Sequence, residues 1–213
     1  MFIQFDGTTG KHTPEGRLYN NMMSRGKKID GVYKYTTVSD NFQNFQYFAE
    51  WCNSQIGFNE KDDYNRNFSL DKDLLLYGNN QYCEDLCVFV PSEINTFILK
   101  GSNTIKINGL PTGVCVGKHD NRWGFMSYCS VPWSKRMKRA GPYTTIKKAY
   151  EKYSTTKEHV AKYLASKWES KIDPRVFEML MKFKTDSRGY CLNSLPLHTT
   201  YNEYSSMDIL HDG

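Results

Sequence analysis

The sequence predicts a mixed α+β fold, and three observations lead to that fold class. Apolar and aromatic residues recur at helical spacing over residues 41–55 and again over residues 145–169. Residues 68–99 follow the order strand, long loop, strand, helix, and residues 112–135 contain short strand-like runs separated by turns. The chain of 213 residues is 15% aromatic, so it can bury one sizeable core or two small ones.

The N-terminal helices are predicted from the spacing of their apolar residues. A short helix over residues 16–26 ends at a glycine. In residues 41–55 the aromatic stripe begins with Phe42 and Phe45, and Asp40 precedes it as the expected N-cap. Such a stripe faces a protein core more often than a ligand, so we expect these rings in the core.

Residues 68–99 hold the clearest strand signal of the first half. Residues 87–90, with the sequence CVFV, have the composition of a buried strand. Pro91 then opens a helix that runs to the end of the segment. Residues 100–109 are rich in Gly, Ser and Asn and predict a linker, so residues 1–99 form the expected first domain.

Residues 112–135 predict two or three short strands. Turn signals lie at residues 119–121 and near Pro132. The long helix over residues 145–169 follows, with its apolar residues on one face.

A last helix is predicted after Asp173 and Pro174, which have the residue types of an N-cap and a first helical position. It ends near Lys184, and residues 185–213 show no helical or strand period. We therefore expect a second domain over residues 110–184, followed by a loose tail.

The net charge of +5 conceals an uneven distribution of charge along the chain. Residues 1–99 have a net charge of −4 and residues 185–213 of −3, whereas residues 100–184 hold 18 Lys and Arg against 6 Asp and Glu. A segment with this net charge of +12 is typical of a protein that binds a nucleic acid backbone. A solvated helix face explains the same lysines equally well.

Composition also narrows the class of protein. No run of 18 apolar residues occurs, and the start of the chain has neither a basic leader nor an apolar stretch, so membrane spanning and secretion are disfavoured. The six cysteines are too sparse for a disulfide scaffold and suit a reducing cytoplasm as thiols. No GxxxxGKS/T, GxGxxG or GxSxG pattern occurs, which removes the usual nucleotide-binding and serine-hydrolase hypotheses.

Oxygen-bearing side chains gather on the strand, loop, strand, helix frame. The set is Asp71, Asp73, Asn79, Asn80 and Asn95. The end of the first strand and the helix can converge on one cation in such a frame. Oxygen ligands suit Mg²⁺ or Mn²⁺, which clamp a scissile phosphate and stabilise the leaving oxygen. The alternative is a loop whose Asp and Asn residues serve turns alone.

This segment resembles the HNH, or His-metal finger, nucleases of phages and mobile introns. That family has an Asp-His pair, then Asn-Asn eight residues on, an apolar strand and a Ser-Glu helix. Here Asp71 matches the Asp, Asn79 and Asn80 fall eight and nine residues later, and CVFV and PSEIN match the strand and helix. The resemblance reaches upstream to LYNNMMSR and covers residues 16–99.

The resemblance implies a small ββα-metal-like nuclease domain at the N-terminal side. By it, Asp71 is a metal ligand and Asn95 is the nearest candidate for the ligand on the helix. Asn79 or Asn80 holds the loop.

Lys72 stands where the family has the His that acts as general base. A lysine ammonium is a poor base near neutral pH, and the flanking Asp71 and Asp73 stabilise its charged form. Three interpretations follow: Lys72 binds phosphate while another group or the metal supplies hydroxide, the nuclease is inactive, or the resemblance concerns architecture only. Similar phage proteins with an LDKD, GN, FVP, IN pattern also lack the His, so the lysine is typical of that subfamily.

Three stretches of the basic half share a second pattern: TGV at residues 112–114, the strand around Arg122 and Trp123, and GPYTTIKKAYEKY at residues 141–153. Together they resemble the Apetala-type DNA-binding domain. That resemblance implies a three-stranded antiparallel sheet packed on one helix, with strand residues entering the major groove.

By the same resemblance, Arg122 and Trp123 contact bases and sugar-phosphate. Neighbouring cations hold phosphates. These cations are Lys118, Lys135, Arg136, Lys138 and Arg139. Ordinary sheet packing remains the alternative for Trp123, and solubility remains the alternative for the lysines.

Zinc is an alternative cofactor because Cys83 and Cys87 lie beside the loop. A structural site needs four ligands, and only Cys52 with distant Cys115 or Cys129 remain to complete it. Structural Zn²⁺ is therefore disfavoured.

The first functional hypothesis is a phage-type, metal-dependent DNA endonuclease or nickase acting on double-stranded DNA in the cytoplasm of an infected bacterial host. Its expected catalytic residues are Asp71, Lys72, Asp73 and Asn80, and its expected metal ligands are Asp71 and Asn95. The second hypothesis is a catalytically inactive DNA-binding protein that serves a phage as a regulator or inhibitor of host defence, with a possible host protein partner. The third is a protein-binding module whose basic face meets an acidic partner.

Overall fold

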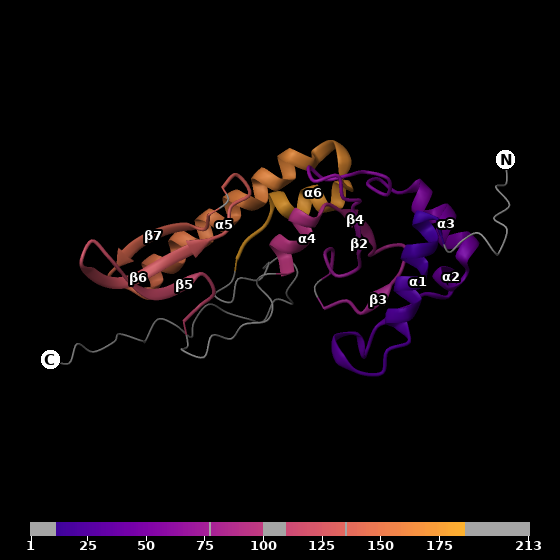
Figure 1. Cartoon of the computed structure of the whole chain (residues 1–213), viewed down its shortest axis with the longest axis horizontal. Coiled ribbons are helices and arrows are strands. Elements are labelled where there is room, and N and C mark those ends of the chain that lie inside the picture. Colours follow the sequence, from indigo (N-terminus) through magenta and orange to yellow (C-terminus); the bar gives the residue numbers. More distant parts are fainter. Residues whose placement is uncertain (1–11, 77, 100–109, 135, 186–213) are drawn as a thin grey trace. The chain divides into compact units, whose positions relative to one another are not determined.

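A computed structural model of the chain describes residues 12–76, 78–99, 110–134 and 136–185 (Figure 1). These residues form a mixed α+β fold, as predicted. They divide into two compact units, of which the first comprises residues 12–97 and 164–181 and the second comprises the remaining described residues.

Residues 164–181 follow the basic segment along the chain, and we expected them in the second domain. In the structure they pack with the first unit. The expected linker, residues 100–109, and residues 186–213 of the expected tail lie outside the described residues.

Three helices open the first unit. α1 (Pro14–Gly26) begins after Thr13, whose side chain accepts a hydrogen bond from the Gly16 backbone N–H over 3.0 Å. Where we predicted one helix over residues 41–55, the structure has α2 (Asp40–Gln43) and α3 (Phe45–Ser54).

The break between α2 and α3 lies at Asn44. Its backbone is extended, and its side chain accepts a hydrogen bond from the Tyr47 N–H over 3.2 Å, so it caps α3. The prediction of Asp40 as N-cap was wrong, because Ser39 caps α2 by accepting from the Phe42 N–H. A short polar side chain that satisfies backbone donors can end one helix and begin the next.

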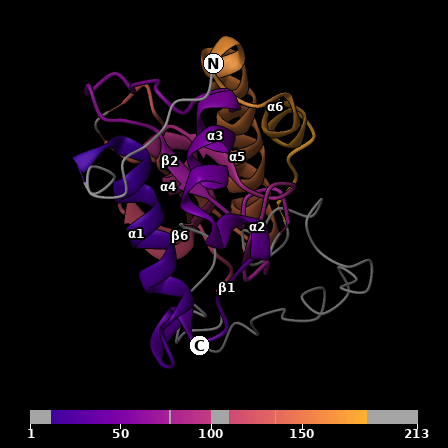
Figure 2. The ribbon, with the colours of Figure 1, turned by 90° about the vertical axis from the view of Figure 1, so that its right-hand side faces the viewer.

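The aromatic stripe of α2 and α3 faces the core, as predicted. Phe42 and Phe48 are fully buried. α1 lies beside α3 (Figure 2), and the ring centroids of Tyr19 and Phe45 are 5.2 Å apart in an edge-to-face arrangement. Trp51 extends this packing, because its ring lies 4.7 Å from that of Phe42.

The strand, loop, strand, helix order of residues 68–99 is confirmed. β2 (Ser69–Asp71) pairs antiparallel with β4 (Val88–Val90), and α4 (Ser92–Leu99) follows. Within the loop, β3 (Gln81–Tyr82) pairs in parallel with β1 (Thr37–Val38). All residues of β4 are buried, so this strand lies in the core of the first unit.

The first unit also contains the C-terminal end of α5 (Ile146–Trp168), a 3₁₀ turn at Glu169–Lys171 and α6 (Pro174–Met181). The Asp173 carboxylate accepts from the Arg175 N–H over 2.8 Å, which confirms the predicted cap. The helix ends at Met181, earlier than predicted.

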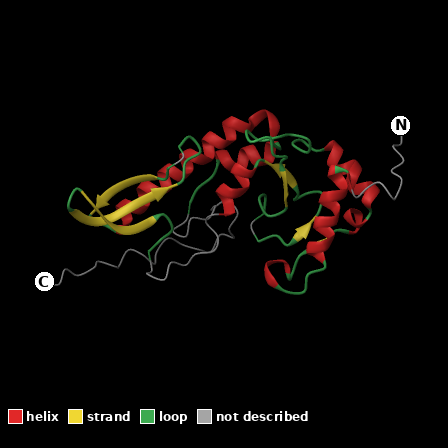
Figure 3. Cartoon of the chain, in the orientation of Figure 1, coloured by secondary structure: helices red, strands yellow, loops and turns green. Residues whose placement is uncertain are grey.

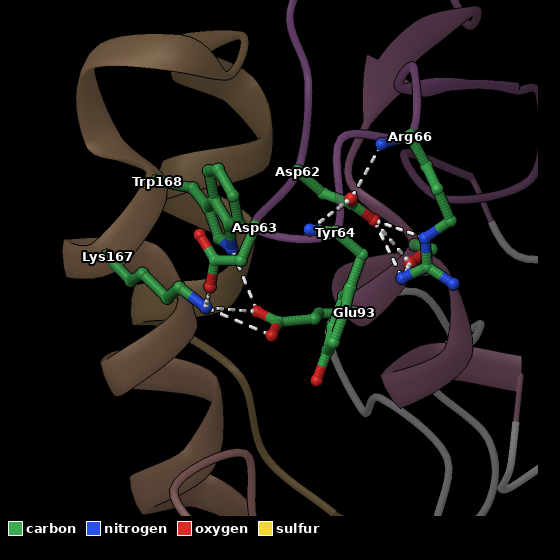
Figure 4. Close-up of polar contacts among 8 residues, drawn as sticks. Asp62, Asp63, Tyr64, Arg66, Glu93, Lys167 and Trp168 are labelled. Carbon is green, nitrogen blue, oxygen red and sulfur yellow. Dashed lines mark hydrogen bonds and ion pairs between the residues drawn. The ribbon is translucent and has the colours of Figure 1, made fainter.

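A polar network fixes the start of α4 against the end of α5 (Figure 4). The Lys167 amino group donates to Glu93 over 2.8 Å and to Asp63 over 2.6 Å. The Trp168 indole N–H donates to the same Glu93 carboxylate over 3.1 Å. Because these partners are distant in sequence, the network holds the C-terminal elements in the first unit.

Asp62 anchors a second part of this network. Its buried carboxylate accepts from Arg66 Nε over 2.8 Å and from Ser92 Oγ over 3.0 Å. Burial alone would raise the pKa of Asp62, but the hydrogen bonds from Arg66, Ser92 and the Tyr64 N–H lower it to about 2. The acidic loop is therefore held by internal pairs.

The second unit is a three-stranded antiparallel sheet packed on a helix, as predicted (Figure 3). β5 (Val114–His119) pairs with β6 (Arg122–Cys129), which pairs with β7 (Lys138–Tyr143). The N-terminal part of α5 covers one face. Its buried cluster consists of Val114, Cys129, Ala149, Tyr150 and Tyr153.

The conformation of the sheet depends on its turn and on one glycine. Asp120 and Asn121 have φ values of 49° and 64°, as a two-residue type I′ hairpin requires, which confirms the turn predicted at residues 119–121. Gly113 has φ +81°, and a Cβ there would lie 2.0 Å from the Tyr153 ring. Only glycine fits this position.

Among the described residues, no helix combines the length and the apolar character that a membrane span requires. The cysteines in the described part of the chain are free thiols, as expected. They are Cys52, Cys83, Cys87, Cys115 and Cys129.

Candidate functional site

Asp71 lies at the end of β2, where the chain turns into the loop. Its Oδ1 accepts hydrogen bonds from the backbone N–H groups of Asp73 and Leu74, each over 2.8 Å. Burial raises the pKa of the Asp71 carboxyl, and these two hydrogen bonds oppose the rise only in part. The geometry therefore fixes the position of this carboxylate.

Lys72 is buried and directed into the loop. Its amino group donates to the Asn79 carbonyl over 2.8 Å and to the Asp73 carboxylate, and it lies 5.9 Å from the centroid of the Tyr82 ring. In both hydrogen bonds the amine is the donor, and both acceptors belong to the loop itself. The geometry therefore disfavours Lys72 as a general base, and it also disfavours Lys72 as a phosphate-binding cation.

Asn79 holds the loop through its side chain. Its Nδ2 donates to the carbonyls of Lys72 and Gln81, each over 2.7 Å, and its Oδ1 accepts from the Gln81 N–H over 3.0 Å. The side chain of Asn80 is exposed, and its backbone carbonyl accepts from the Thr37 N–H over 2.8 Å. Of the two asparagines that the resemblance offered for this role, the contacts favour Asn79.

Asn95 lies on α4, and its Oδ1 is a buried acceptor with no hydrogen-bond partner among the described residues. Buried acceptors normally have a donor, so this oxygen is suited to a cation. Asp71 at the end of β2 thus offers a carboxylate and Asn95 on α4 an amide oxygen; β4, which precedes α4 in the chain, pairs with β2. In the part of the chain that the structure describes, no group of three or more His, Cys, Asp or Glu side chains suits a metal.

In the described ranges, Cys83 and Cys87 do not belong to any group of three or more potential metal ligands of the His, Cys, Asp or Glu type. The Cys87 thiol is buried, and burial raises its pKa.

Arg25 also belongs to this site, although it was not predicted from the sequence. Its guanidinium donates to the Tyr82 hydroxyl over 2.8 Å. Burial alone would lower the pKa of Arg25, but this hydrogen bond and the charges of Tyr33 and Asp71 raise it. In the sequence, the only indication of Arg25 was its place at the end of LYNNMMSR, within the stretch that carries the resemblance. The pairing of β1 with β3 brings the end of α1 to the loop of residues 72–82.

In the second unit, strand alternation separates the predicted DNA-binding residues into two sets. Consecutive residues of a strand point to opposite faces, so Arg122 and Trp123 do not share a face. Arg122 and Tyr128 are an even number of residues apart on β6, so both point to the same face. Arg139 pairs with Tyr128 across the strands and points to that face as well. We call the face that carries Arg122, Tyr128 and Arg139 the outer face. Val114 and Cys129 point to the opposite face, which packs on α5.

One cation of the outer face, Arg139, rests on an aromatic ring. The Arg139 guanidinium lies 5.1 Å from the centroid of the Tyr128 ring, and the Arg139 side chain is exposed. A hydrogen bond with Cys115 raises the pKa of the Tyr128 hydroxyl. The guanidinium is therefore supported on one side and faces solvent on the other.

The remaining predicted residues are exposed at other places. Trp123 is 71% exposed and pairs with Lys118 on the opposite face to Arg122, so the alternative of ordinary packing against the helix does not hold. Arg136 is exposed just before β7, and Lys138 is the exposed first residue of β7. Lys135 lies outside the described residues.

Comparison with models of known protein families finds no match for this chain, and no curated protein and no solved structure matches it. The functional interpretation therefore depends on the residues and contacts described above.

Proposed function

We propose that the chain is a metal-dependent DNA endonuclease or nickase, built on the strand, loop, strand, helix segment that resembles the HNH nucleases. One observation carries the proposal: Asp71 ends β2, and Asn95 on α4 has a buried amide oxygen with no hydrogen-bond partner in the described part of the chain. Together they supply the two kinds of oxygen that hard divalent cations prefer.

Asp71 and Asn95 would hold Mg²⁺ or Mn²⁺. When bound, the ion supplies positive charge at the scissile phosphate and lowers the pKa of a coordinated water. Asp71 is fixed by its two backbone hydrogen bonds, and Asn79 fixes the loop that follows. In this proposal Lys72 and Asp73 support the loop through their mutual ion pair.

Double-stranded DNA is the proposed substrate, and the outer face of the sheet is its proposed binding surface. The guanidinium groups of Arg122 and Arg139 can each make two parallel hydrogen bonds to guanine or to phosphate. Arg136, exposed just before β7, would hold the DNA backbone nearby, whereas Lys118 and Lys138 lie on the opposite face of the sheet.

The experiment compares nicking of supercoiled plasmid by the full chain with Mg²⁺, with Mn²⁺ and with EDTA. Asp71→Asn keeps an oxygen that can accept from the Asp73 and Leu74 N–H groups but loses the charge. We expect it to reduce metal-dependent nicking by about 100-fold or more, because metal-bound charge stabilisation is worth several kcal/mol. Asp40→Asn, at an exposed position, serves as the matched control.

A second candidate function is DNA binding without cleavage, in which the protein acts in a bacterial host as a phage regulator or inhibitor of host defence. The contacts of Lys72 favour it, because the residue at the expected base position donates its hydrogen bonds to the loop itself. Duplex binding with no metal-dependent nicking would support this candidate. A wild-type protein that neither binds nor nicks DNA would refute both.

A further inference from the structure

A cationic loop lies in the otherwise acidic first half of the chain. Residues 25–35 carry four cationic side chains and one carboxylate, whereas residues 1–99 together have a net charge of −4. The cations are Arg25, Lys27, Lys28 and Lys34. We call residues 25–35 the lysine-tyrosine loop, and Figure 1 shows it at the lower end of α1, in indigo.

The side chains of this loop are unusually exposed. Ile29 is 86% exposed and Tyr35 is 71% exposed. Lys28 and Lys34 are exposed as well. Exposed apolar and aromatic groups next to cations are more common at binding surfaces than on an inert loop.

Tyrosine rings support three of the cations. Arg25 and Lys28 lie 5.1 Å and 5.4 Å from the centroid of the Tyr33 ring. Lys34 lies 5.3 Å from the centroid of the Tyr35 ring. Each cation is therefore restrained on one side and keeps donors for an anionic ligand on the other.

The backbone of the loop is ordered by local hydrogen bonds. The Lys28 N–H donates to the Arg25 carbonyl over 3.2 Å, and the Thr36 N–H donates to the Tyr33 carbonyl over 2.9 Å. A short 3₁₀ helix, Gly31–Tyr33, forms its far end (Figure 3), and Gly31 has φ +67°. A preorganised loop loses less conformational entropy when it binds.

The lysine-tyrosine loop is also joined directly to the candidate site. It ends just before β1, which pairs with β3, and Arg25 donates to Tyr82 at the end of β3. Asn79, three residues before Tyr82 in the chain, carries the carbonyl that accepts from Lys72. Anything bound along the loop would therefore lie close to the segment that begins at Asp71.

We propose that the lysine-tyrosine loop is a second DNA-binding surface, which holds the phosphate backbone of the duplex beside Asp71. The inference rests on the proposed function, because it assumes that duplex DNA is the ligand. Lysines interleaved with rings fit the outside of a duplex, since the cations pair with phosphates and an exposed ring can pack on a sugar. The lysine-tyrosine loop would explain how the first unit binds DNA although residues 1–99 have a net negative charge.

The experiment measures binding of the full chain to a fluorescent duplex by anisotropy, over a range of salt concentrations. Lys28→Gln combined with Lys34→Gln is expected to reduce the slope of log affinity against log salt by about 1.8, because each lost phosphate contact contributes about 0.9. Tyr35→Ala removes the ring that supports Lys34 and is expected to weaken binding about threefold with little change in slope.

The matched control combines Lys61→Gln with Lys171→Gln, which removes the same charge from the first unit outside the loop. We expect its slope to equal that of the wild type. Circular dichroism checks that each variant is folded.

Equal slopes for the loop variant and the control would overturn the inference and leave the proposed function intact. Absence of duplex binding by the wild type would overturn the proposed function together with the inference. Binding to phosphatidylserine vesicles that depends on Lys28 and Lys34, with an unchanged DNA slope, would assign the loop to a membrane surface and overturn the inference too.

Discussion

The loop of residues 72–82 and the outer face of the sheet both carry cations, but they present them differently. Lys72 is 7% exposed, and its amino group donates to the Asn79 carbonyl and the Asp73 carboxylate. Arg139 is exposed and rests on the Tyr128 ring. One cation is used inside the fold, and the other is presented to solvent.

This difference shows that the type of residue does not decide its availability to a ligand. A buried cation whose donors are satisfied stabilises the loop, and leaving those acceptors unpaired is costly. An exposed guanidinium on a ring keeps its remaining donors for a phosphate or a base. We therefore expect substitutions in the two regions to separate stability from DNA binding.

The largest expected effect is in the second unit. Gly113→Ala places a Cβ 2.0 Å from the Tyr153 ring at φ +81°, so we expect a loss of about 3–4 kcal/mol in the free energy of unfolding. Urea unfolding measures the loss. Gly78→Ala is the matched control, because Gly78 has the same φ but nothing within 4 Å of its Cβ, and it should cost only about 1 kcal/mol. Similar costs for the two variants would mean that Tyr153 does not restrict Gly113.

Lys72→Met tests the interior use of a cation. The variant keeps an apolar stem but leaves the Asn79 carbonyl and the Asp73 carboxylate without their donor, so we expect a loss of about 2–3 kcal/mol in stability. The salt dependence of duplex binding should not change. Lys61→Met, on the surface, should stay within about 0.5 kcal/mol of the wild type. A stable Lys72→Met protein with weakened DNA binding would assign Lys72 to the phosphate instead.

Asp62→Asn tests the pH dependence of the internal pairs. The folded-state pKa of about 2 lies below the usual unfolded value of about 3.9, so Asp62 contributes stability that is present above pH 4 and is lost as the pH falls toward 2. At pH 7 we expect the variant to be about 1–2 kcal/mol less stable than the wild type. Urea midpoints between pH 7 and pH 2 should converge as the pH is lowered. A gap that stays constant over this range would contradict the assignment.

Arg139→Gln has the smallest expected effect on stability and sharpens the comparison. We expect a change within about 0.5 kcal/mol in the free energy of unfolding, because the side chain is exposed. The slope of log duplex affinity against log salt should fall by about 0.9. Arg17→Gln, on α1 in the first unit, is the charge-matched control for the anisotropy titration.

Local signals in the sequence were sufficient for most of the helices and for the order of the strands. The stripe of Phe42 and Phe48 predicted a buried helix face, and residues 119–121 predicted a turn, because side-chain spacing and turn chemistry act over a few residues. The break at Asn44 was not predicted, because the helical spacing of the apolar residues continues on both sides of it. Only the side chain of Asn44, which caps α3, marks the break. Opposite faces for Arg122 and Trp123 followed from strand alternation alone but were not foreseen from the resemblance.

The sequence by itself determined the α+β composition, the acidic and basic halves, and the set of oxygen-bearing residues from Asp71 to Asn95. Only the tertiary structure decided which of these groups are satisfied internally: Lys72 by Asn79, Asp62 by Arg66. It also decided that Arg25 reaches Tyr82 and that residues 164–181 join the first unit. The physical reason is that burial and hydrogen bonding depend on partners distant in the chain, which residue spacing does not encode.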